Sequence, residues 1–344
     1  MVKRKSPPWW RSSKSEGPKI KENFPAKKTK IVEEHSTLKV ILENDIRSNP
    51  ECEHGPSVLF ERTLSNNKSK TQFYACSAFR DKKQCPFYLL PNSKGVKSSQ
   101  KLLKRVLKRP LKLVQNPTVF CSTCQILLDE DGKKGHKKSH EWITDQSLKN
   151  PSKLLTALDN SKSQAQFHFS QESIEVIVKS IKSQNPSLVI CIGTPSIFEA
   201  LKEYSNDEAF EVLLLDIDQR LSMFHEEFCH YNMFNHHFFD QESLEIYQKH
   251  LGKHEKLVVI TDPPFGGRPE LIVNTLKLIK SDFGILDNHI NFMQVSSISS
   301  ITQRQKTLMK YFFVSCQTIG FDVSSLHSFI TLLIMYVLGY CAAG

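Results

Sequence analysis

One short stretch combines a carboxylate, two prolines and an aromatic ring: Thr261-Asp262-Pro263-Pro264-Phe265-Gly266-Gly267. It follows the apolar run 256–260, which predicts a buried parallel strand, and ligands of open α/β sheets bind beyond the carboxyl ends of such strands. The Asp262 carboxylate and the Pro263 carbonyl can both accept hydrogens from an exocyclic amine, which stabilises the charge that develops on nitrogen. Phe265 can stack on a base taken out of its helix. Alternatively, the stretch is a tight turn that needs Pro and Gly for its shape.

A first group of metal-binding residue types surrounds two strand-like pieces, 57–60 and 71–75. The group consists of Cys52, His54, Cys76 and Cys85. A thiolate and an imidazole two residues apart can reach one ion from a tight turn, and two distant thiolates would complete a tetrahedral zinc site. The alternative is a pair of buried core cysteines with a surface histidine.

A second group has the spacing C-x2-C-x11-H-x3-H. Its members are Cys121, Cys124, His136 and His140. Two histidines four residues apart share one face of a helix, and the cysteine pair forms a knuckle, so this spacing predicts a second zinc site. The alternative is a redox cysteine pair with unrelated histidines.

Residues 150 to 290 alternate helical and strand-like segments. A strand at 187–192 ends at Gly193, and the next strand, 212–218, contains Asp216. An acid there, 23 residues after Gly193, is placed to hold ribose hydroxyls of a nucleotide-like cofactor. One glycine does not meet the dinucleotide fingerprint, but S-adenosylmethionine has no pyrophosphate. The order of strands, glycine loop, Asp216 and the later Asp262 stretch predicts an α/β, Rossmann-like class I methyltransferase core.

The composition favours a polyanionic partner. The chain has 46 Lys and Arg against 36 Asp and Glu, a net charge of +10 and a pI near 9.0. Nucleic acid or an anionic membrane surface would suit this charge. Four of the nine cysteines lie in or near short pairs with histidine, which indicates a reducing compartment and metal binding. The basic N-terminus has no apolar run, so we predict no signal peptide.

Two basic segments flank the first metal group. Residues 1–40 hold eleven Lys and Arg, four acids and four prolines, and we expect 1–50 to be a disordered basic arm. A basic cluster at 27–30 could be a nuclear address, and the alternative is a solvating tail. The segment 94–112 has eight Lys and Arg and no acid, with apolar residues at helical spacing. This predicts a basic amphipathic helix that contacts RNA. The alternatives are a helix that lies on an anionic membrane surface and an ordinary surface helix with a solvated face.

Histidines crowd the region from His225 to His237. We interpret this region as packed structure rather than a metal site, because the histidines alternate with Phe and Met. The string from Cys229 to Asp240 suggests a cofactor-side loop that leads into a strand.

Several of these stretches resemble the ribosomal RNA N6-adenosine methyltransferases that have CCHC zinc fingers. The first metal group also resembles the GRF-type zinc finger, which binds nucleic acid with a three-stranded zinc ribbon. The matching stretches are 52–56, 73–78, 121–124, 165–169, 193–195, 213–218, 229–240 and 261–267. They are distributed over a region from about 52 to 280, so the resemblance spans roughly two-thirds of the chain.

The resemblance implies transfer of a methyl group from S-adenosylmethionine to an adenosine amine of large-subunit rRNA. It implies a location in the nucleus and nucleolus, with the cytoplasm as a further location. Asp262, Pro263, Pro264 and Phe265 would hold the target adenine. The cofactor would contact Gln166, Phe167, His168, Phe169, Gly193, Asp216, Asn232 and Asp262. One zinc ion would bind Cys52, His54, Cys76 and Cys85, and a second would bind Cys121, Cys124, His136 and His140.

We therefore expect six segments in a monomeric chain. They are a basic arm (1–50), a GRF-type finger (51–95), a basic linker helix (96–118), a C2H2-type finger (119–145), the methyltransferase core (150–285) and a divergent tail (286–344). After about residue 282 the sequence stops resembling the family, so we expect the later strands to be missing from a truncated or mis-spliced product. The apolar stretch 329–343 is short for a membrane span, and a tail anchor is the alternative. The rival function is an inactive, zinc-dependent RNA-binding protein with a degenerate core.

Overall fold

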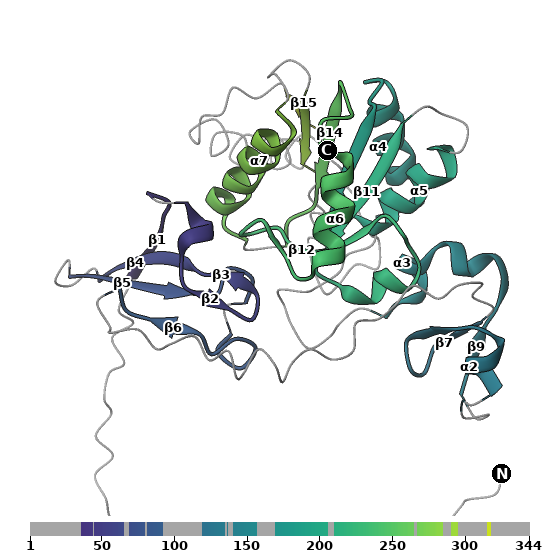
Figure 1. The fold of residues 1–344 in the computed structure, drawn as a ribbon, viewed down its shortest axis with the longest axis horizontal. Coiled ribbons are helices and arrows are strands. Elements are labelled where there is room, and N and C mark those ends of the chain that lie inside the picture. Colours follow the sequence, from purple (N-terminus) through teal and green to yellow (C-terminus); the bar gives the residue numbers. More distant parts are fainter. Residues whose placement is uncertain are drawn as a thin grey trace, which may run out of the picture.

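The structure is a computed structural model of the chain. It describes residues 36–43, 45–64, 69–79, 81–91, 119–134, 136, 140–156, 169–205, 210–264, 267–284, 290–294 and 315–317. Along this part of the chain a small β module comes first, a second β module follows, and a larger α/β core comes last (Figure 1).

The core is built on one mostly parallel sheet with the strand order β13-β12-β11-β10-β14-β15-β16. The five inner strands run parallel, and β13 and β16 pair antiparallel at the two ends. The strands are β10 (Leu188–Ile192), β11 (Glu211–Asp216), β12 (Phe228–Asn232), β13 (His237–Phe238), β14 (Leu257–Thr261), β15 (Ile290–Gln294) and β16 (Ser315–Gln317). The predicted apolar strands thus form the centre of the sheet, and the predicted α/β class is confirmed.

Helices cover both faces of this sheet. All five residues of β10 are buried, because alternate side chains pack under helices on opposite faces. Val189 contributes to the cluster with α4 (Gln171–Lys182) and α5 (Pro195–Ser205). Ile190 contributes to the cluster with α6 (Gln241–His250) and α7 (Pro269–Phe283). Short 3-10 turns lie at η1 (Ile46–Ser48), η2 (Asp145–Lys149) and η4 (Gln219–Met223).

The sheet extends further than we expected from the sequence. We predicted that the later strands were missing after about residue 282, but β15 pairs with β14 and β16 pairs with β15. Ile290 and Met293 of β15 are buried against the rest of the core. Polar residues interrupt this strand and a Ser-rich segment follows it, so its sequence shows no clear period.

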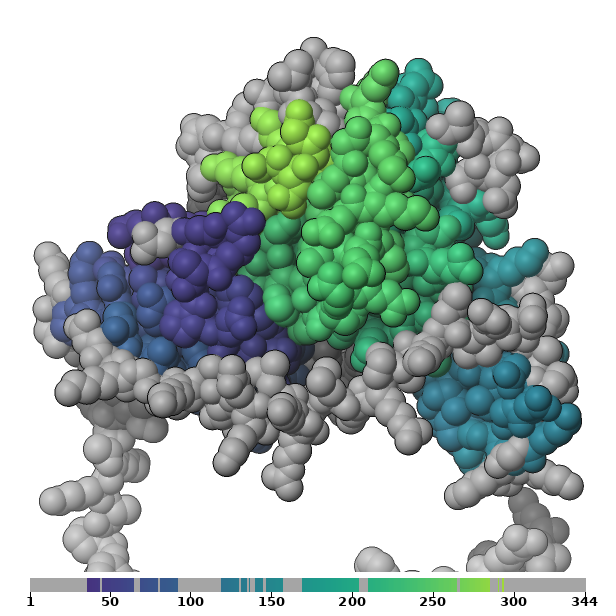
Figure 2. Space-filling view, viewed as in Figure 1, coloured from purple at the N-terminus to yellow at the C-terminus, as the bar shows by residue number. Residues whose placement is uncertain are grey.

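The first module is a four-stranded antiparallel sheet in the order β1-β4-β5-β6, with a small β2-β3 hairpin. Its strands are β1 (Ser36–Ile41), β2 (Glu51–Cys52), β3 (Gly55–Pro56), β4 (Val58–Leu64), β5 (Lys70–Ala75) and β6 (Tyr88–Leu89). The strand-like pieces predicted at 57–60 and 71–75 correspond to β4 and β5. In the space-filling view this module, in purple and blue, lies directly against the green core (Figure 2).

The prediction of a disordered arm up to residue 50 is wrong from Ser36 onward. Strand β1 pairs with β4 along its whole length, and Val40 and Ile46 are buried with only 6% and 2% exposure. The apolar positions of this short strand are hidden in a Lys-rich composition, which alone favours disorder. The first module therefore has four strands, one more than the three-stranded zinc ribbon that its sequence resembles.

The second module is a three-stranded sheet in the order β8-β7-β9. It comprises β7 (Val119–Cys121), β8 (Ile126–Leu128), α2 (Glu130–Lys134) and β9 (Trp142–Ile143), and α3 (Pro151–Leu154) connects it to the core. Its Phe120 ring lies 5.9 Å from that of Phe224 in the core. Phe120 and Leu127 join the cluster of α4 and α5, whereas Val40, Ile46 and Phe60 of the first module join the cluster of α6 and α7.

Three predicted segments fall outside the described residues. They are the arm before residue 36, the basic helix within 94–112 and the apolar stretch 329–343. Where the structure is described, no helix has both the length and the apolar character that crossing a membrane requires.

Candidate functional site

Three loops meet at the carboxyl edge of the sheet because neighbouring strands are in register. Ile192 of β10 pairs with Leu215 of β11 and with Thr261 of β14. The residues that follow these three are Gly193, Asp216 and Asp262. The backbone N–H of Gly193 donates to the Leu215 carbonyl (3.0 Å), and that of Asp262 donates to the Ile192 carbonyl (3.2 Å). The structure therefore places the predicted glycine and both acids in one row.

Gly193 has a left-handed backbone conformation, which favours glycine, and it has close neighbours on the side where a Cβ atom would lie. Its φ is +68°, and a Cβ atom there would lie 2.9 Å from Met233 Cε and 3.4 Å from the Asp262 carbonyl oxygen. Any side chain would strain the backbone and displace Met233. The single glycine thus allows the three loops to approach one another closely.

Both acids in the row have pKa values near neutrality. Burial raises the pKa of Asp216 to about 7 and the pKa of Asp262 to about 7. Asp216 Oδ1 accepts a hydrogen bond from the Asp218 backbone N–H at 2.8 Å. No donor to the Asp262 carboxylate lies among the described residues. Asp262 can therefore offer its carboxylate to a donor on a bound ligand.

The Asp262 stretch forms a turn at the end of β14. The N–H of Gly267 donates to the Pro264 carbonyl at 2.9 Å, and Pro263 and Pro264 are half-buried. A Cβ atom on Gly267 would lie 3.0 Å from the Phe234 ring, so this second glycine also permits a close approach. Phe265 lies outside the described residues.

The predicted Asn232 lies at the end of β12 and uses its amide internally. Its Nδ2 donates to the His54 carbonyl and to Ser77 Oγ, both at 2.9 Å, and its Oδ1 accepts from the Phe234 N–H at 3.1 Å. The string from 229 to 240 is a strand, a turn and the short strand β13, rather than a loop that leads into a strand. Asn232 thus joins the first module to the sheet.

Most of the other residues that we predicted to contact the cofactor are not among the described residues. Gln166, Phe167 and His168 lie outside the described residues. Phe169 is buried in the cluster beneath α4 and α5, directly before the N-cap of α4.

The first predicted metal group converges in the first module. The donor atoms of Cys52, His54, Cys76 and Cys85 all lie within 4.8 Å of one another. The Cys76 sulfur lies 3.5 Å from His54 Nδ1, and a tetrahedral zinc ion would separate such atoms by about 3.6 Å. Ile217, next to Asp216, packs against this group. The group is compatible with zinc and contacts the carboxyl edge of the core.

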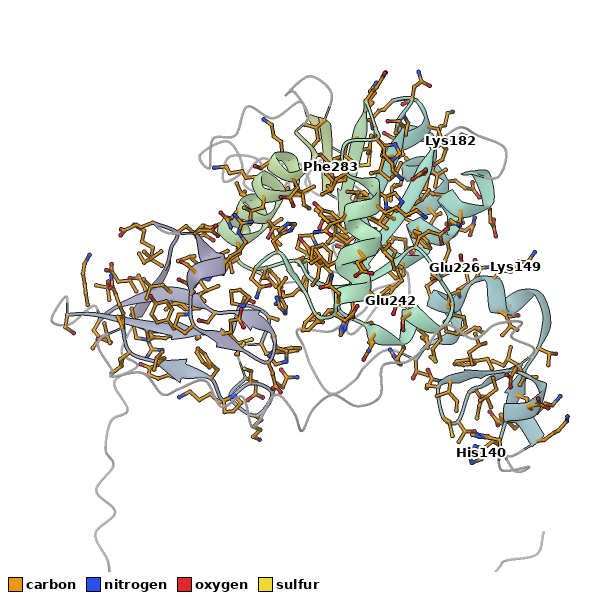
Figure 3. The ribbon with its side chains drawn as sticks, in the orientation of Figure 1. His140, Lys149, Lys182, Glu226, Glu242 and Phe283 are labelled. Atoms are coloured by element: carbon orange, nitrogen blue, oxygen red, sulfur yellow. The ribbon has the colours of Figure 1, made fainter. Side chains whose placement is uncertain are left out.

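The second predicted metal group also converges, in the second module. The donor atoms of Cys121, Cys124, His136 and His140 lie within 4.8 Å of one another. The sulfur of Cys124 lies 3.3 Å from His140 Nδ1, and His136 Nε2 lies 3.0 Å from the same nitrogen. This Cys2His2 set is also compatible with zinc. His140 lies on the side of the module that faces away from the core (Figure 3).

The expected helix under the two histidines is not present where we placed it. Helix α2 ends at Lys134, and His136 and His140 lie in non-helical backbone after it. Gly132 lies within this short helix, and glycine lowers helix stability. The ligand spacing, rather than a shared helix face, therefore brings the two imidazoles together.

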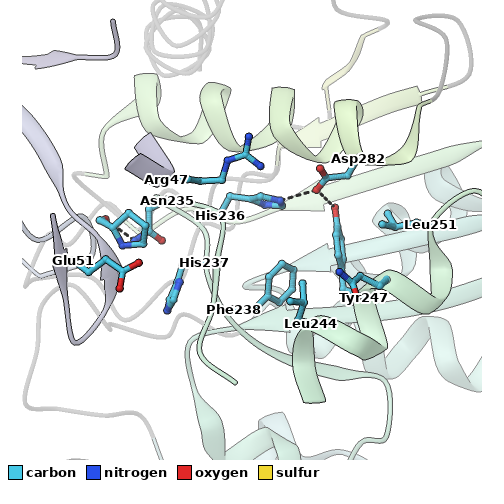
Figure 4. A pocket seen from close by; sticks show the side chains of 12 residues that line it. Arg47, Glu51, Asn235, His236, His237, Phe238, Leu244, Tyr247, Leu251 and Asp282 are labelled. Carbon is cyan, nitrogen blue, oxygen red and sulfur yellow. Dashed lines mark hydrogen bonds and ion pairs between the residues drawn. The ribbon is translucent and has the colours of Figure 1, made fainter. Parts of the chain in front are cut away.

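A separate cleft of about 390 Å³ lies between the first module and the core. Within it, His236 Nε2 lies 2.8 Å from Asp282 Oδ2, and the Tyr247 hydroxyl donates to the same oxygen at 3.1 Å (Figure 4). The Tyr231 hydroxyl lies 2.6 Å from His236 Nδ1. Sequence reasoning missed this network, because Asp282 lies 46 positions from His236 and 35 from Tyr247, and the set follows no motif. The polar groups of this network form hydrogen bonds with one another, so we infer that the network stabilises the fold rather than binding a ligand.

Comparison with known proteins gives one family. A family model described as probable N6-adenine methyltransferase matches residues 160–336. This match includes β15, β16 and most of the tail that we expected to diverge.

The chain also resembles three curated rRNA N(6)-adenosine-methyltransferases ZCCHC4. It is 38% identical to that of Homo sapiens over 255 residues, which are 66% of this chain and 50% of that protein. It is 39% identical to that of Bos taurus over 274 residues (71% and 53%) and 35% identical to that of Xenopus tropicalis over 271 residues (71% and 55%). The chain spans about half the length of the curated relatives it matches. Because the family model covers just over half of the 344 residues and includes the row of Gly193, Asp216 and Asp262, the chain belongs to the N6-adenine methyltransferase family.

Proposed function

We propose that this chain transfers a methyl group from S-adenosylmethionine to the N6 amine of an adenosine in large-subunit rRNA. The observation that supports this best is the row of Gly193, Asp216 and Asp262 at the carboxyl edge of a parallel sheet. The names of its relatives supply the substrate class.

The row suits a cofactor that carries a ribose. The absence of a side chain at Gly193 allows a ligand to approach the backbone, and the Asp216 carboxylate can accept hydrogen bonds from ribose hydroxyls. When bound, S-adenosylmethionine would supply an electrophilic methyl group. Asp262, beside Gly193, would lie between this cofactor and the base.

The target amine would be oriented by acceptors from the Asp262 turn. The Asp262 carboxylate and the Pro263 carbonyl would each accept one amine hydrogen, which directs the nitrogen lone pair toward the methyl carbon. With the amine held by Asp262 and Pro263, the cofactor would supply its methyl group to the nitrogen and leave as a neutral thioether, and the amine would lose one proton to water. No strong base is needed, so catalysis would consist mainly of positioning.

Two Cys/His groups compatible with zinc and the net charge of +10 support RNA binding in this proposal. Each module presents a Cys/His group, and Lys and Arg side chains would contact phosphates. We also propose a nuclear and nucleolar location, since rRNA is made there. The rival function, an inactive RNA-binding remnant, was based on missing strands; β15 and β16 remove that basis.

The proposal is tested by methyl transfer to large-subunit rRNA, with N6-methyladenosine measured by mass spectrometry. We expect Asp262→Ala to lower the rate at least about 100-fold while RNA affinity stays nearly unchanged, because it removes one acceptor at the reacting amine. Glu175→Ala, which removes an exposed carboxylate from α4, is the matched control and should keep full activity. Full activity in Asp262→Ala would disprove the assigned role.

A further inference from the structure

One short loop connects the first metal module to the carboxyl edge of the core. This linking loop, Asn232-Met233-Phe234-Asn235, begins at the last residue of β12 and leads toward β13. Its outer residues bond to the module, and its inner residues contact the two glycines of the proposed active site. We infer that the linking loop positions the active site relative to the first metal group, with Asn235 as the positioning residue.

The outer residues, Asn232 and Asn235, donate hydrogen bonds to backbone carbonyls at and near the metal ligand His54. Asn235 is fully buried, and its Nδ2 donates to the His54 carbonyl at 3.0 Å and to the Pro56 carbonyl at 2.8 Å. Asn232 donates to the same His54 carbonyl. Because His54 is itself a ligand of the metal group, the position of this carbonyl depends on the conformation of the metal site.

The inner residues occupy the space that the two glycines leave. Met233 Cε lies 2.9 Å from the position of a Cβ atom on Gly193, and Phe234 Cε1 lies 3.0 Å from that on Gly267. Gly193 belongs to the proposed cofactor loop and Gly267 to the Asp262 turn. A shift of the linking loop would therefore change both halves of the site together.

The role of Asn235 follows from the distances that methyl transfer requires. Reacting atoms must be held about 3–3.5 Å apart, and a misplacement of about 1 Å can lower a rate about 100-fold. Asn235→Ala removes two buried hydrogen bonds and leaves both carbonyls without that donor. We expect kcat to fall at least about tenfold, and to change more than KM for S-adenosylmethionine.

The experiment compares Asn235→Ala with Asn49→Ala in the whole 344-residue chain after loading with zinc. Asn49 Nδ2 donates to the Ser57 carbonyl at 2.8 Å, a bond of the same kind that stays within the first module. Hydrogen exchange is measured at the Gly193 and Gly267 amides, which donate to the Leu215 and Pro264 carbonyls. We expect exchange at both amides to accelerate at least about tenfold in Asn235→Ala and to stay unchanged in Asn49→Ala. Zinc content, measured for each variant, should stay at two ions per chain.

Two results would overturn the inference: unchanged exchange at both glycine amides in folded Asn235→Ala, or equal acceleration in both variants. If Asn235→Ala does not fold, Ser77→Ala removes only the Ser77 Oγ acceptor of Asn232 and should accelerate exchange by a smaller factor. The kinetic effect rests on the proposed function, whereas the exchange effect does not. Accelerated exchange in a chain that methylates no RNA would support the linking loop and disprove the proposed activity.

Discussion

Asp216 and Asp262 are acids whose burial makes their charge depend on pH near neutrality. Burial favours the protonated form of each, so the pKa of each is raised to about 7. The two acids therefore lower the free energy of unfolding least below about pH 4. Their ionisation lowers it progressively more as the pH rises to 7. A bound ligand that donates hydrogen bonds to the carboxylates has the opposite preference and binds best when they are ionised.

The affinity for S-adenosylmethionine should therefore rise as the pH increases from 5.5 to 7.5. Below the pKa of Asp216, deprotonation must accompany binding, which lowers affinity by up to about tenfold for each pH unit. Calorimetric titration at several pH values measures this slope. Asp216→Asn should bind more weakly and with a smaller slope; an equal slope in both proteins would exclude Asp216 as the group that titrates.

At the scale of elements, the site depends on three strands that end in register and on glycines that keep their loops together. The chain offers a direct comparison between two glycines in the same left-handed region. Gly193 has a φ of +68° and close neighbours, whereas Gly252 has a φ of +70° and no atom within 4 Å of its Cβ position. The comparison separates backbone strain from crowding of the site.

We predict that Gly193→Ala and Gly252→Ala each lower the free energy of unfolding by about 1–2 kcal/mol through strain. Gly193→Ala should also lower cofactor affinity at least about tenfold, because its methyl group displaces Met233. Thermal denaturation and calorimetric titration of both variants check this. Equal cofactor affinity in the two variants would show that the close approach at Gly193 has no role in binding.

The elements also show what the sequence could and could not predict. Strands β10, β11 and β14 are continuous apolar runs, so their burial and their order along the chain were predictable. Strands β1 and β15 were not, because basic or polar neighbours mask their few apolar positions. The metal ligands followed from their spacing, but the linking loop did not, because its hydrogen bonds join residues 178 to 181 positions apart.

At the scale of the whole molecule, the first and second modules pack against the apolar clusters on opposite faces of the central sheet. Val40, Ile46 and Phe60 of the first module belong to the same apolar cluster as α6 and α7. Phe120 and Leu127 of the second module belong to the cluster with α4 and α5. The modules are thus parts of the packed core rather than independent attachments.

A substitution in the first module should therefore destabilise the whole protein. Ile46→Ala, at a side chain only 2% exposed, should lower the free energy of unfolding by about 2–4 kcal/mol. Val176→Ala, at a side chain 58% exposed on α4, should change it by less than about 0.5 kcal/mol. Urea denaturation followed by circular dichroism measures both. A negligible effect of Ile46→Ala would mean that this residue does not pack in the core.

The hydrogen bond between Asn232 and His54 also has a consequence in time, during synthesis of the chain. The two residues are 178 positions apart, so at roughly 5–20 residues per second His54 is made about 10–35 seconds before Asn232. By then the ligand set of Cys52, His54, Cys76 and Cys85 has long been complete. A metal ion can therefore bind while the linking loop is still untranslated, and the nascent core would then fold against a metal site that is already formed.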